Sequence, residues 1–175
     1  MINLTLRRAE AADAARLSLL GGATFLTSFA HDHPGDALVA HVDAYHSVDW
    51  YQCLLADAGC VAWILETDLR APVGYALLTP PAIDCPTDAG DLELKRIYLL
   101  APFQSGGWGV RLLEAAEAEA RTRGAGKLYL CVYRANVAAQ RFYLRQGFTD
   151  TGYIQNFRVG DVQYEDMILA KDLAG

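Results

Sequence analysis

A glycine-rich segment at the start of a predicted helix contains the residues whose types and spacing point most clearly to chemistry. The stretch LAPFQSGGWGVRLLEAAE, residues 100–117, places Gln104, Gly106, Gly107 and Gly109 ahead of a run of apolar residues with helical spacing. The first backbone N–H groups of a helix lack intrahelical partners and carry the positive end of the helix dipole. Glycines let a ligand approach such groups closely, so the segment predicts a binding site for a phosphate or another anion.

Two common phosphate loops do not fit this segment. A nucleotide-hydrolysing loop requires Gly-Lys-Ser/Thr, but Gly109 is followed by Val110 and Arg111. A dinucleotide-binding loop requires a small residue three positions after Gly109, where Leu112 stands. We therefore expect neither nucleotide hydrolysis nor NAD binding, and the spacing that remains to be explained is Gln-x-x-Gly-x-Gly.

This spacing resembles the pattern Arg/Gln-x-x-Gly-x-Gly/Ala that follows the fourth strand in the GCN5-related N-acetyltransferase (GNAT) family. Two longer stretches carry the same resemblance, IYLLAPFQSGGWGVRLLEAAEAEA at 97–120 and YLCVYRANVAAQRFYLRQGF at 129–148. The match covers residues 60–150 well and residues 1–58 only in outline. The resemblance implies that the co-substrate is acetyl-CoA and that the acceptor is a primary amine, which attacks the thioester directly.

The resemblance also implies which residues contact the cofactor. Backbone groups of Ile97, Tyr98 and Leu99 would pair with the pantetheine arm like an additional strand and polarise the thioester carbonyl. The pyrophosphate would be bound by the backbone of Gln104, Ser105, Gly106, Gly107, Trp108, Gly109 and Val110. Asn136 either contacts the cofactor, caps a helix, or does both. Arg145, like Arg70, Arg111 and Arg134, either meets the 3′-phosphate of the cofactor or is simply solvated.

Two side chains are candidates for proton transfer. An amine is an ammonium near neutral pH and must lose a proton before it attacks. Glu93 occupies a strand position resembling that of the glutamate base in histone acetyltransferases of the family; the alternatives are a chain of water molecules as the base and an exposed surface position for Glu93. Tyr143 matches the tyrosine that gives a proton to the departing CoA thiolate in the family. Its alternative role is that of an aromatic core residue.

The C-terminal segment resembles, more narrowly, the bacterial PaiA-type spermidine and spermine acetyltransferases. That subgroup carries an aromatic Met-Gly-Asp turn, followed by Gln-x-x-Asp and then Met. Val159 replaces the first Met here, while the spacing is kept by Gly160, Asp161, Gln163, Asp166 and Met167. A net charge of −6 suits a polycationic acceptor. Thr27 and Phe29, in the early segment TFLTSFAHDH, are candidates for the wall of the acceptor cleft.

Composition and periodicity predict one mixed α/β domain over residues 1–175. The chain is long enough to bury a core, and 53% of its residues are hydrophobic against 21% charged. Strands are predicted at 60–66, 72–80, 92–100 and 127–133, with a helix after the glycines and another between Asn136 and Gly147. A helix near the N-terminus is expected to end at Gly21 and Gly22. The C-terminal residues are expected to form a hairpin.

The element order and the resemblance together imply a GNAT-like fold. We expect a mostly antiparallel central sheet with one parallel strand–helix–strand unit and helices on both faces. Within the single domain, residues 1–58 would form the variable substrate side, residues 60–150 the acetyl-CoA core and residues 151–172 the C-terminal hairpin.

Several other classes of function are not favoured by the sequence. The acidic pI near 5.1 argues against a nucleic-acid partner. The His-Asp-His segment at His31 and His33 lacks the spacing of a metal site, and the four cysteines form no CxxC pair. No signal peptide or membrane span is expected, so the cytoplasm is the expected location. A homodimer through the hairpin, a peptide or protein amine as acceptor, and a non-catalytic CoA-binding sensor remain open alternatives.

Overall fold

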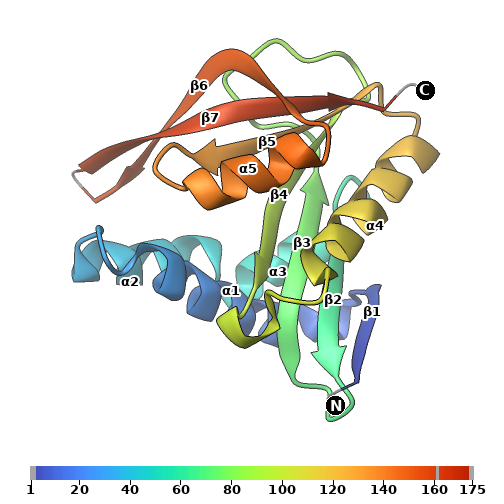
Figure 1. The fold of residues 1–175 in the computed structure, drawn as a ribbon. Helices are drawn as coiled ribbons and strands as arrows, with labels where there is room; N and C mark the ends of the chain where they lie inside the picture. Colours follow the sequence, from blue (N-terminus) through green and yellow to red (C-terminus); the bar gives the residue numbers. More distant parts are fainter. Residues whose placement is uncertain (1–2, 161, 174–175) are drawn as a thin grey trace.

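A computed structural model describes residues 3–160 and 162–173. Its centre is one seven-stranded sheet with the order β1-β2-β3-β4-β5-β7-β6 (Figure 1). Only β4 and β5 pair in parallel, and all other neighbours are antiparallel. The strands are β1 (Leu4–Arg8), β2 (Val61–Thr67), β3 (Pro72–Thr79), β4 (Leu92–Leu99), β5 (Lys127–Tyr133), β6 (Thr149–Val159) and β7 (Val162–Asp172). The predicted mixed α/β fold is confirmed.

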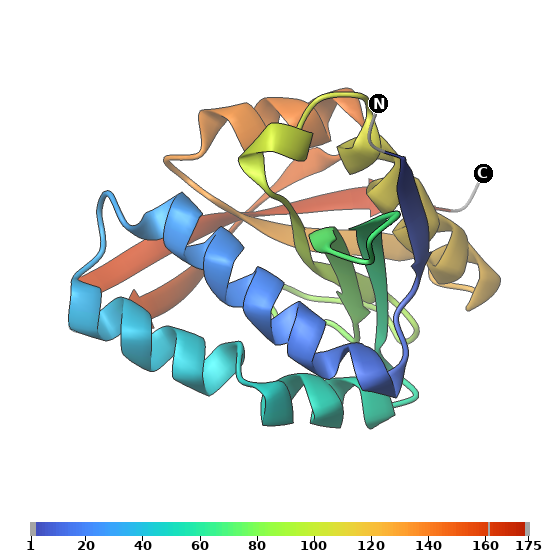
Figure 2. The same ribbon diagram turned by 90° about the horizontal axis from the view of Figure 1, so that it is seen from below.

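Helices cover both faces of this sheet, as predicted. Three N-terminal helices lie together on one side, and two later helices lie on the other (Figures 1 and 2). The helices are α1 (Ala14–Phe29), α2 (Gly35–Tyr45), α3 (Val48–Ala56), α4 (Trp108–Thr122) and α5 (Val137–Arg145). Short 3-10 turns cover Ala11–Asp13 and Ala101–Phe103. None of the described helices combines the length and apolarity needed to cross a membrane.

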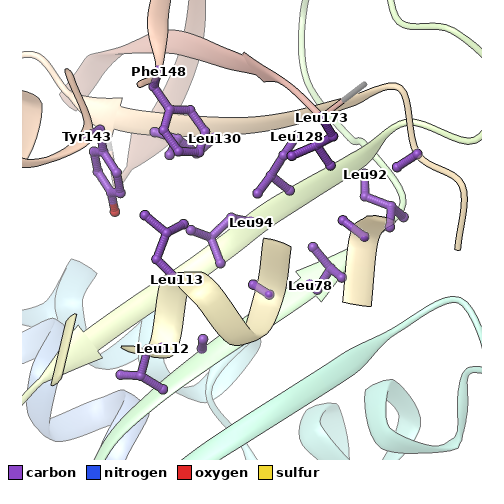
Figure 3. Packing of buried hydrophobic residues seen from close by; sticks show 14 of the residues in the cluster. Leu78, Leu92, Leu94, Leu112, Leu113, Leu128, Leu130, Tyr143, Phe148 and Leu173 are labelled. Atoms are coloured by element: carbon purple, nitrogen blue, oxygen red, sulfur yellow. The ribbon is translucent and has the colours of Figure 1, made fainter. Parts of the chain in front are cut away.

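Each helical layer packs its own hydrophobic core against the sheet. On one face, Leu112 and Leu113 of α4 join Leu94 of β4, Leu130 of β5 and Phe148, all nearly fully buried (Figure 3). The other face holds a second cluster, formed by Leu17, Leu20, Tyr51, Ile64, Tyr75 and Leu77. Because the alternate side chains of β4 reach both clusters, this strand is fixed from both sides.

The expected helix end at Gly21 and Gly22 is wrong, because α1 continues through both residues to Phe29. A Cβ atom at Gly21 would collide with the side chains of His46 and Tyr51. The glycine therefore allows α1 to approach the α2–α3 connection closely. The extra helical turns carry Phe25 and Phe29 to the cleft described below.

A buried charge network ties β1 to the start of α1. The guanidinium of Arg7 donates to both carboxylate oxygens of Asp13 (2.7 and 2.8 Å) and to both oxygens of Glu66 on β2 (2.9 and 3.0 Å). Asp13 and Glu66 are nearly fully buried. The Arg7 hydrogen bond is the main cause that holds the pKa of Asp13 well below its usual range.

Candidate active site

A cleft opens where β4 and β5 separate. The two strands pair only at Leu92 with Leu128 and at Glu93 with Tyr129. β4 then continues along β3, whereas β5 continues along β7. The space between them is a cleft of about 890 Å³, which is lined by residues of β4, β5, α1, α4 and α5.

The backbone of β4 presents one unpaired edge to this cleft. Ile97, Tyr98 and Leu99 pair with Ala76, Tyr75 and Gly74 of β3 on one side, and β5 has already left on the other. A strand with a free edge can accept an extended ligand as an additional strand. The three residues that the sequence predicted for this role therefore lie where such pairing is geometrically available, and all three line the cleft.

The glycine-rich segment forms the end of the cleft beside α4. Gly106 and Gly107 have φ values of +85° and +78°, a left-handed conformation that glycine adopts without strain. The N–H of Arg111 donates to the carbonyl of Gly107 (3.1 Å), so the amides of the three residues before it have no partner within the helix. The cleft lining includes Gln104, Gly107, Gly109 and Val110. This arrangement of unpaired N–H groups suits an anionic group.

Gln104 holds the loop between β4 and α4 in place. Its side-chain amide donates to the carbonyl of Leu99 (3.1 Å), which joins the loop to the end of β4. Ser105, Gly106, Trp108 and Arg145 lie outside the lining of the cleft. The ring of Trp108 instead lies 4.5 Å from the guanidinium of Arg111, and Arg145 is exposed at the end of α5.

Helix α5 brings Asn136 and Tyr143 to the cleft. The side chain of Asn136 accepts a hydrogen bond from the N–H of Ala139 (3.1 Å), so the predicted helix cap is confirmed. Tyr143 packs beside Phe142 and Phe148 and is 9% exposed. Its hydroxyl points away from Phe148 and Leu130 (Figure 3). Burial raises the pKa of Tyr143 well above its usual value, so the phenol stays protonated.

Glu93 lies where the two strands separate and is buried, so the exposed position that the sequence left open is excluded. Its Oε1 accepts from Lys95 Nζ (3.0 Å), and its Oε2 accepts from the N–H of Ala82 (2.9 Å). The register between β3 and β4 skips Lys95, which marks a β-bulge there. Glu93 and Lys95 share one side of the strand because side chains alternate along it. The bulge re-aims the residues that follow, so that Ile97 and Leu99 pack on the same side as Leu94.

The part of the cleft away from the glycines is lined by aromatic rings from α1, α2, β5 and β6. The ring of Phe25 stacks on that of His41 with 4.2 Å between the ring centroids, and the ring centroids of Phe29 and Tyr133 are 6.0 Å apart. Burial lowers the pKa of His41 to about 4, so the imidazole is neutral at physiological pH. Thr27 and Phe29, predicted for the acceptor side, both line this region.

Asp166 belongs to the C-terminal motif but was not predicted as a site residue. The side chain lines the cleft, and its Oδ1 is buried without a hydrogen-bond partner among the described residues. Burial raises the pKa of Asp166 to about 7. Asp161 of the same motif lies outside the described residues.

Cys131 lies on β5 in the same cleft. Burial, together with the nearby carboxylates of Glu93 and Asp166, raises the pKa of its thiol to about 12. The thiol is therefore protonated and a poor nucleophile. Within the described part of the chain, no three His, Cys, Asp or Glu side chains are grouped as metal ligands would be.

Comparison with known proteins agrees with this geometry. A sequence profile of the acetyltransferase (GNAT) family matches residues 25–148. An uncharacterised N-acetyltransferase of Mycobacterium tuberculosis is 29% identical over 161 residues, which cover 92% of this chain and 98% of the relative.

The fold is shared by solved structures of acetyltransferases, two of which contain the cofactor. The PaiA N-acetyltransferase of Thermoplasma acidophilum, solved in complex with coenzyme A, superposes with a TM-score of 0.77 at 18% identity over 97% of this chain and 99% of that one. A putative acetyltransferase, yncA, of Salmonella typhimurium with acetyl-CoA gives 0.66 at 21% identity over 99% and 95%. The profile match covers more than half of the sequence, and the chain therefore belongs to the acetyltransferase (GNAT) family.

Proposed function

We propose that the protein is an acetyl-CoA-dependent N-acetyltransferase that acts on a primary amine. The observation that carries the proposal is the continuity of the unpaired β4 edge at Ile97–Leu99 with the glycine-rich start of α4, both in one cleft. An extended amide-containing arm that ends in a pyrophosphate matches this sequence of binding groups. Coenzyme A or acetyl-CoA is present in the two solved structures described above.

Residues of this cleft are suited to the steps of direct transfer. Acetyl-CoA, when bound, supplies a thioester whose carbonyl carbon the neutral amine attacks. Backbone N–H groups on the free edge of β4 are available to stabilise the oxyanion. Glu93 accepts the amine's proton, directly or through water, and the protonated phenol of Tyr143 donates a hydrogen bond to the departing sulfur. Because Cys131 is held as a thiol, an acetyl-cysteine intermediate is not part of the proposal.

The acceptor proposed for the first trial is an aliphatic polyamine. The whole-chain fold match to a PaiA N-acetyltransferase supports this choice, as do the matched positions at Gln163, Asp166 and Met167. The net charge of the whole protein gives weaker support, because the lining of the cleft contains two cationic side chains, Lys95 and Arg96, as well as the two carboxylates of Glu93 and Asp166.

The test follows release of the CoA thiol from acetyl-CoA with a thiol reagent. Acceptors are spermidine, spermine, putrescine, n-butylamine, lysine and short peptides, and N,N-dimethylbutylamine is the matched control because a tertiary amine yields no stable amide. Turnover with primary amines and none with the control, with mass spectra showing one acetyl group on the product, is the expected result. Turnover with peptides alone would replace the small amine by a protein acceptor, and binding of acetyl-CoA without any turnover would contradict an enzymatic role.

A further inference from the structure

The acceptor half of the cleft contains one carboxyl group that the described residues leave without a hydrogen-bond partner. No described residue donates a hydrogen bond to Asp166, whose Oδ1 is buried. Buried polar atoms in folded proteins are nearly always satisfied, so a carboxyl group in this condition beside an open cleft points to a ligand. We infer that Asp166 binds a second amino group of the acceptor, one that is not acetylated. This inference rests on the proposed function and narrows the acceptor to aliphatic diamines and longer polyamines.

The register of the sheet places Asp166 apart from the reacting centre on the same wall. Asp166 is the partner of Tyr133 on β5, whereas Glu93 is the partner of Tyr129. Residues 129, 131 and 133 share one face of β5 because side chains alternate along a strand. Four residues of strand separate the two levels by about 13 Å between backbones, and both side chains line the cleft. Two carboxylates at different levels suit an acceptor with amino groups spaced along a chain.

The other charges in the cleft already have partners. Lys95 is paired with Glu93, and no ion pair joins it to Asp166 within the described residues. Arg96 donates to the carbonyl of Tyr45 (3.0 Å) and the hydroxyl of Tyr51 (3.1 Å), and its guanidinium lies 4.4 Å from the ring of Trp50. Among the Asp, Glu, Lys and Arg side chains of the described cleft, Asp166 is therefore the one without a hydrogen-bond or ion-pair partner, and it can pair with an added cation.

The surroundings of Asp166 also suit an aliphatic ammonium. Three aromatic residues line the same cleft: Tyr133, Phe157 and Phe29. The centroid of the Tyr133 ring lies 6.3 Å from that of Phe157 and 6.0 Å from that of Phe29. The Tyr133 hydroxyl donates to Asp32 (3.0 Å), which fixes the ring. Aromatic faces attract ammonium groups and pack well against methylene chains. A neutral or anionic side group on the acceptor gains no such contact.

The experiment measures binding rather than turnover, so that it is independent of the proposed reaction. Isothermal titration of spermidine, putrescine and n-butylamine into enzyme saturated with CoA is carried out on the native protein, on Asp166→Asn and on Glu165→Gln. Glu165 is the matched control because it is an exposed carboxylate on the same strand that pairs with Arg134. Titration of CoA alone confirms that each variant is folded.

We expect the native protein and Glu165→Gln to bind spermidine at least about tenfold more tightly than n-butylamine, the size expected for one charge-assisted contact. In Asp166→Asn this ratio falls to near one while the affinity for CoA is unchanged. Equal binding of diamine and monoamine by the native protein, or an unchanged ratio in Asp166→Asn, overturns the inference. Binding that depends on Asp166 without turnover of any amine upholds the inference and contradicts the proposed reaction instead.

Discussion

Glu93 and Tyr129 are the last paired residues of β4 and β5, and the strands diverge immediately beyond them. The end of the pairing creates the cleft, because beyond it the facing backbone edges of β4 and β5 are no longer paired with each other. It also places a carboxylate at the point of divergence. A short 3-10 turn and the glycine-rich loop join the end of β4 to α4, and the strand edge and the start of the helix line the same cleft.

Replacement of Gly109 by alanine is expected to separate stability from cofactor binding. An added Cβ would lie 3.7 Å from Phe142 and 3.8 Å from Leu99, ordinary contacts with two residues that line the cleft. Alanine favours the helix by up to about 1 kcal/mol over glycine, so the melting temperature should rise slightly. The added methyl group would prevent the pyrophosphate from approaching the backbone closely. The affinity for acetyl-CoA, measured by calorimetry, should therefore fall about tenfold or more.

The matched control for this substitution is Gly35→Ala. Gly35 is also a residue of a helix, α2, and nothing lies within 4 Å of an added Cβ. It should show a similar gain in stability with unchanged acetyl-CoA affinity. If Gly109→Ala also retains full affinity, the pyrophosphate does not approach this part of the loop.

Tyr143→Phe is expected to lower kcat by about 100-fold or more, the effect of losing a positioned proton donor, and to leave acetyl-CoA affinity nearly unchanged. The ring remains to pack against Phe148, so the core is preserved. Steady-state kinetics and calorimetry measure the two quantities. Tyr153→Phe, at a half-exposed position on β6, is the control and should retain full activity. Unchanged kcat in Tyr143→Phe would remove the phenol from the mechanism.

Asp166 should lower the free energy of unfolding of the ligand-free protein as the pH rises. Its folded pKa of about 7 lies above the ordinary value of 3.8, so the folded protein holds more protons than the unfolded chain between these values. Stability contributed by the protonated form is therefore present below pH 4 and lost as the pH rises through 7. We expect Asp166→Asn to be about 1–2 kcal/mol more stable than the native protein at pH 8 and to show no advantage at pH 4.

Urea unfolding at the two pH values measures this difference, with Glu165→Gln as the control. A constant difference between the native protein and Asp166→Asn across the range would show that Asp166 does not titrate in it.

The hydrogen-bonded charges around Arg7 should stabilise the protein at neutral pH and lose this effect as the pH falls. Because the pKa of Asp13 is lowered in the folded state, chiefly by the hydrogen bond from Arg7, its contribution is present above pH 4 and is lost as the pH falls. Asp13→Asn should therefore lose about 3 kcal/mol of unfolding free energy at pH 7, since it leaves part of the Arg7 charge uncompensated. The loss should shrink in acid. Asp68→Asn, at an exposed position, should have little effect at any pH.

The sequence predicted the central part of the fold because its signals are local. Strand alternation, the glycines before α4 and the Asn136 cap each depend on a few neighbouring residues. The path of α1 was not predictable in this way, because Gly21 serves a contact with His46 and Tyr51 that exists only after folding. Asp166 was missed for the same reason. Its isolation in the cleft depends on Lys95 and Arg96 being engaged elsewhere.

The most direct test of the account is calorimetric titration of acetyl-CoA into the native protein. A cleft formed by the free β4 edge and the start of α4 predicts one acetyl-CoA per chain, with a dissociation constant of about 1 µM to 1 mM, the usual range for an enzyme and its substrate. Desulfo-CoA should compete because it keeps the pantetheine amides and the pyrophosphate, whereas NAD should not. The absence of measurable acetyl-CoA binding would contradict the assignment of the cleft.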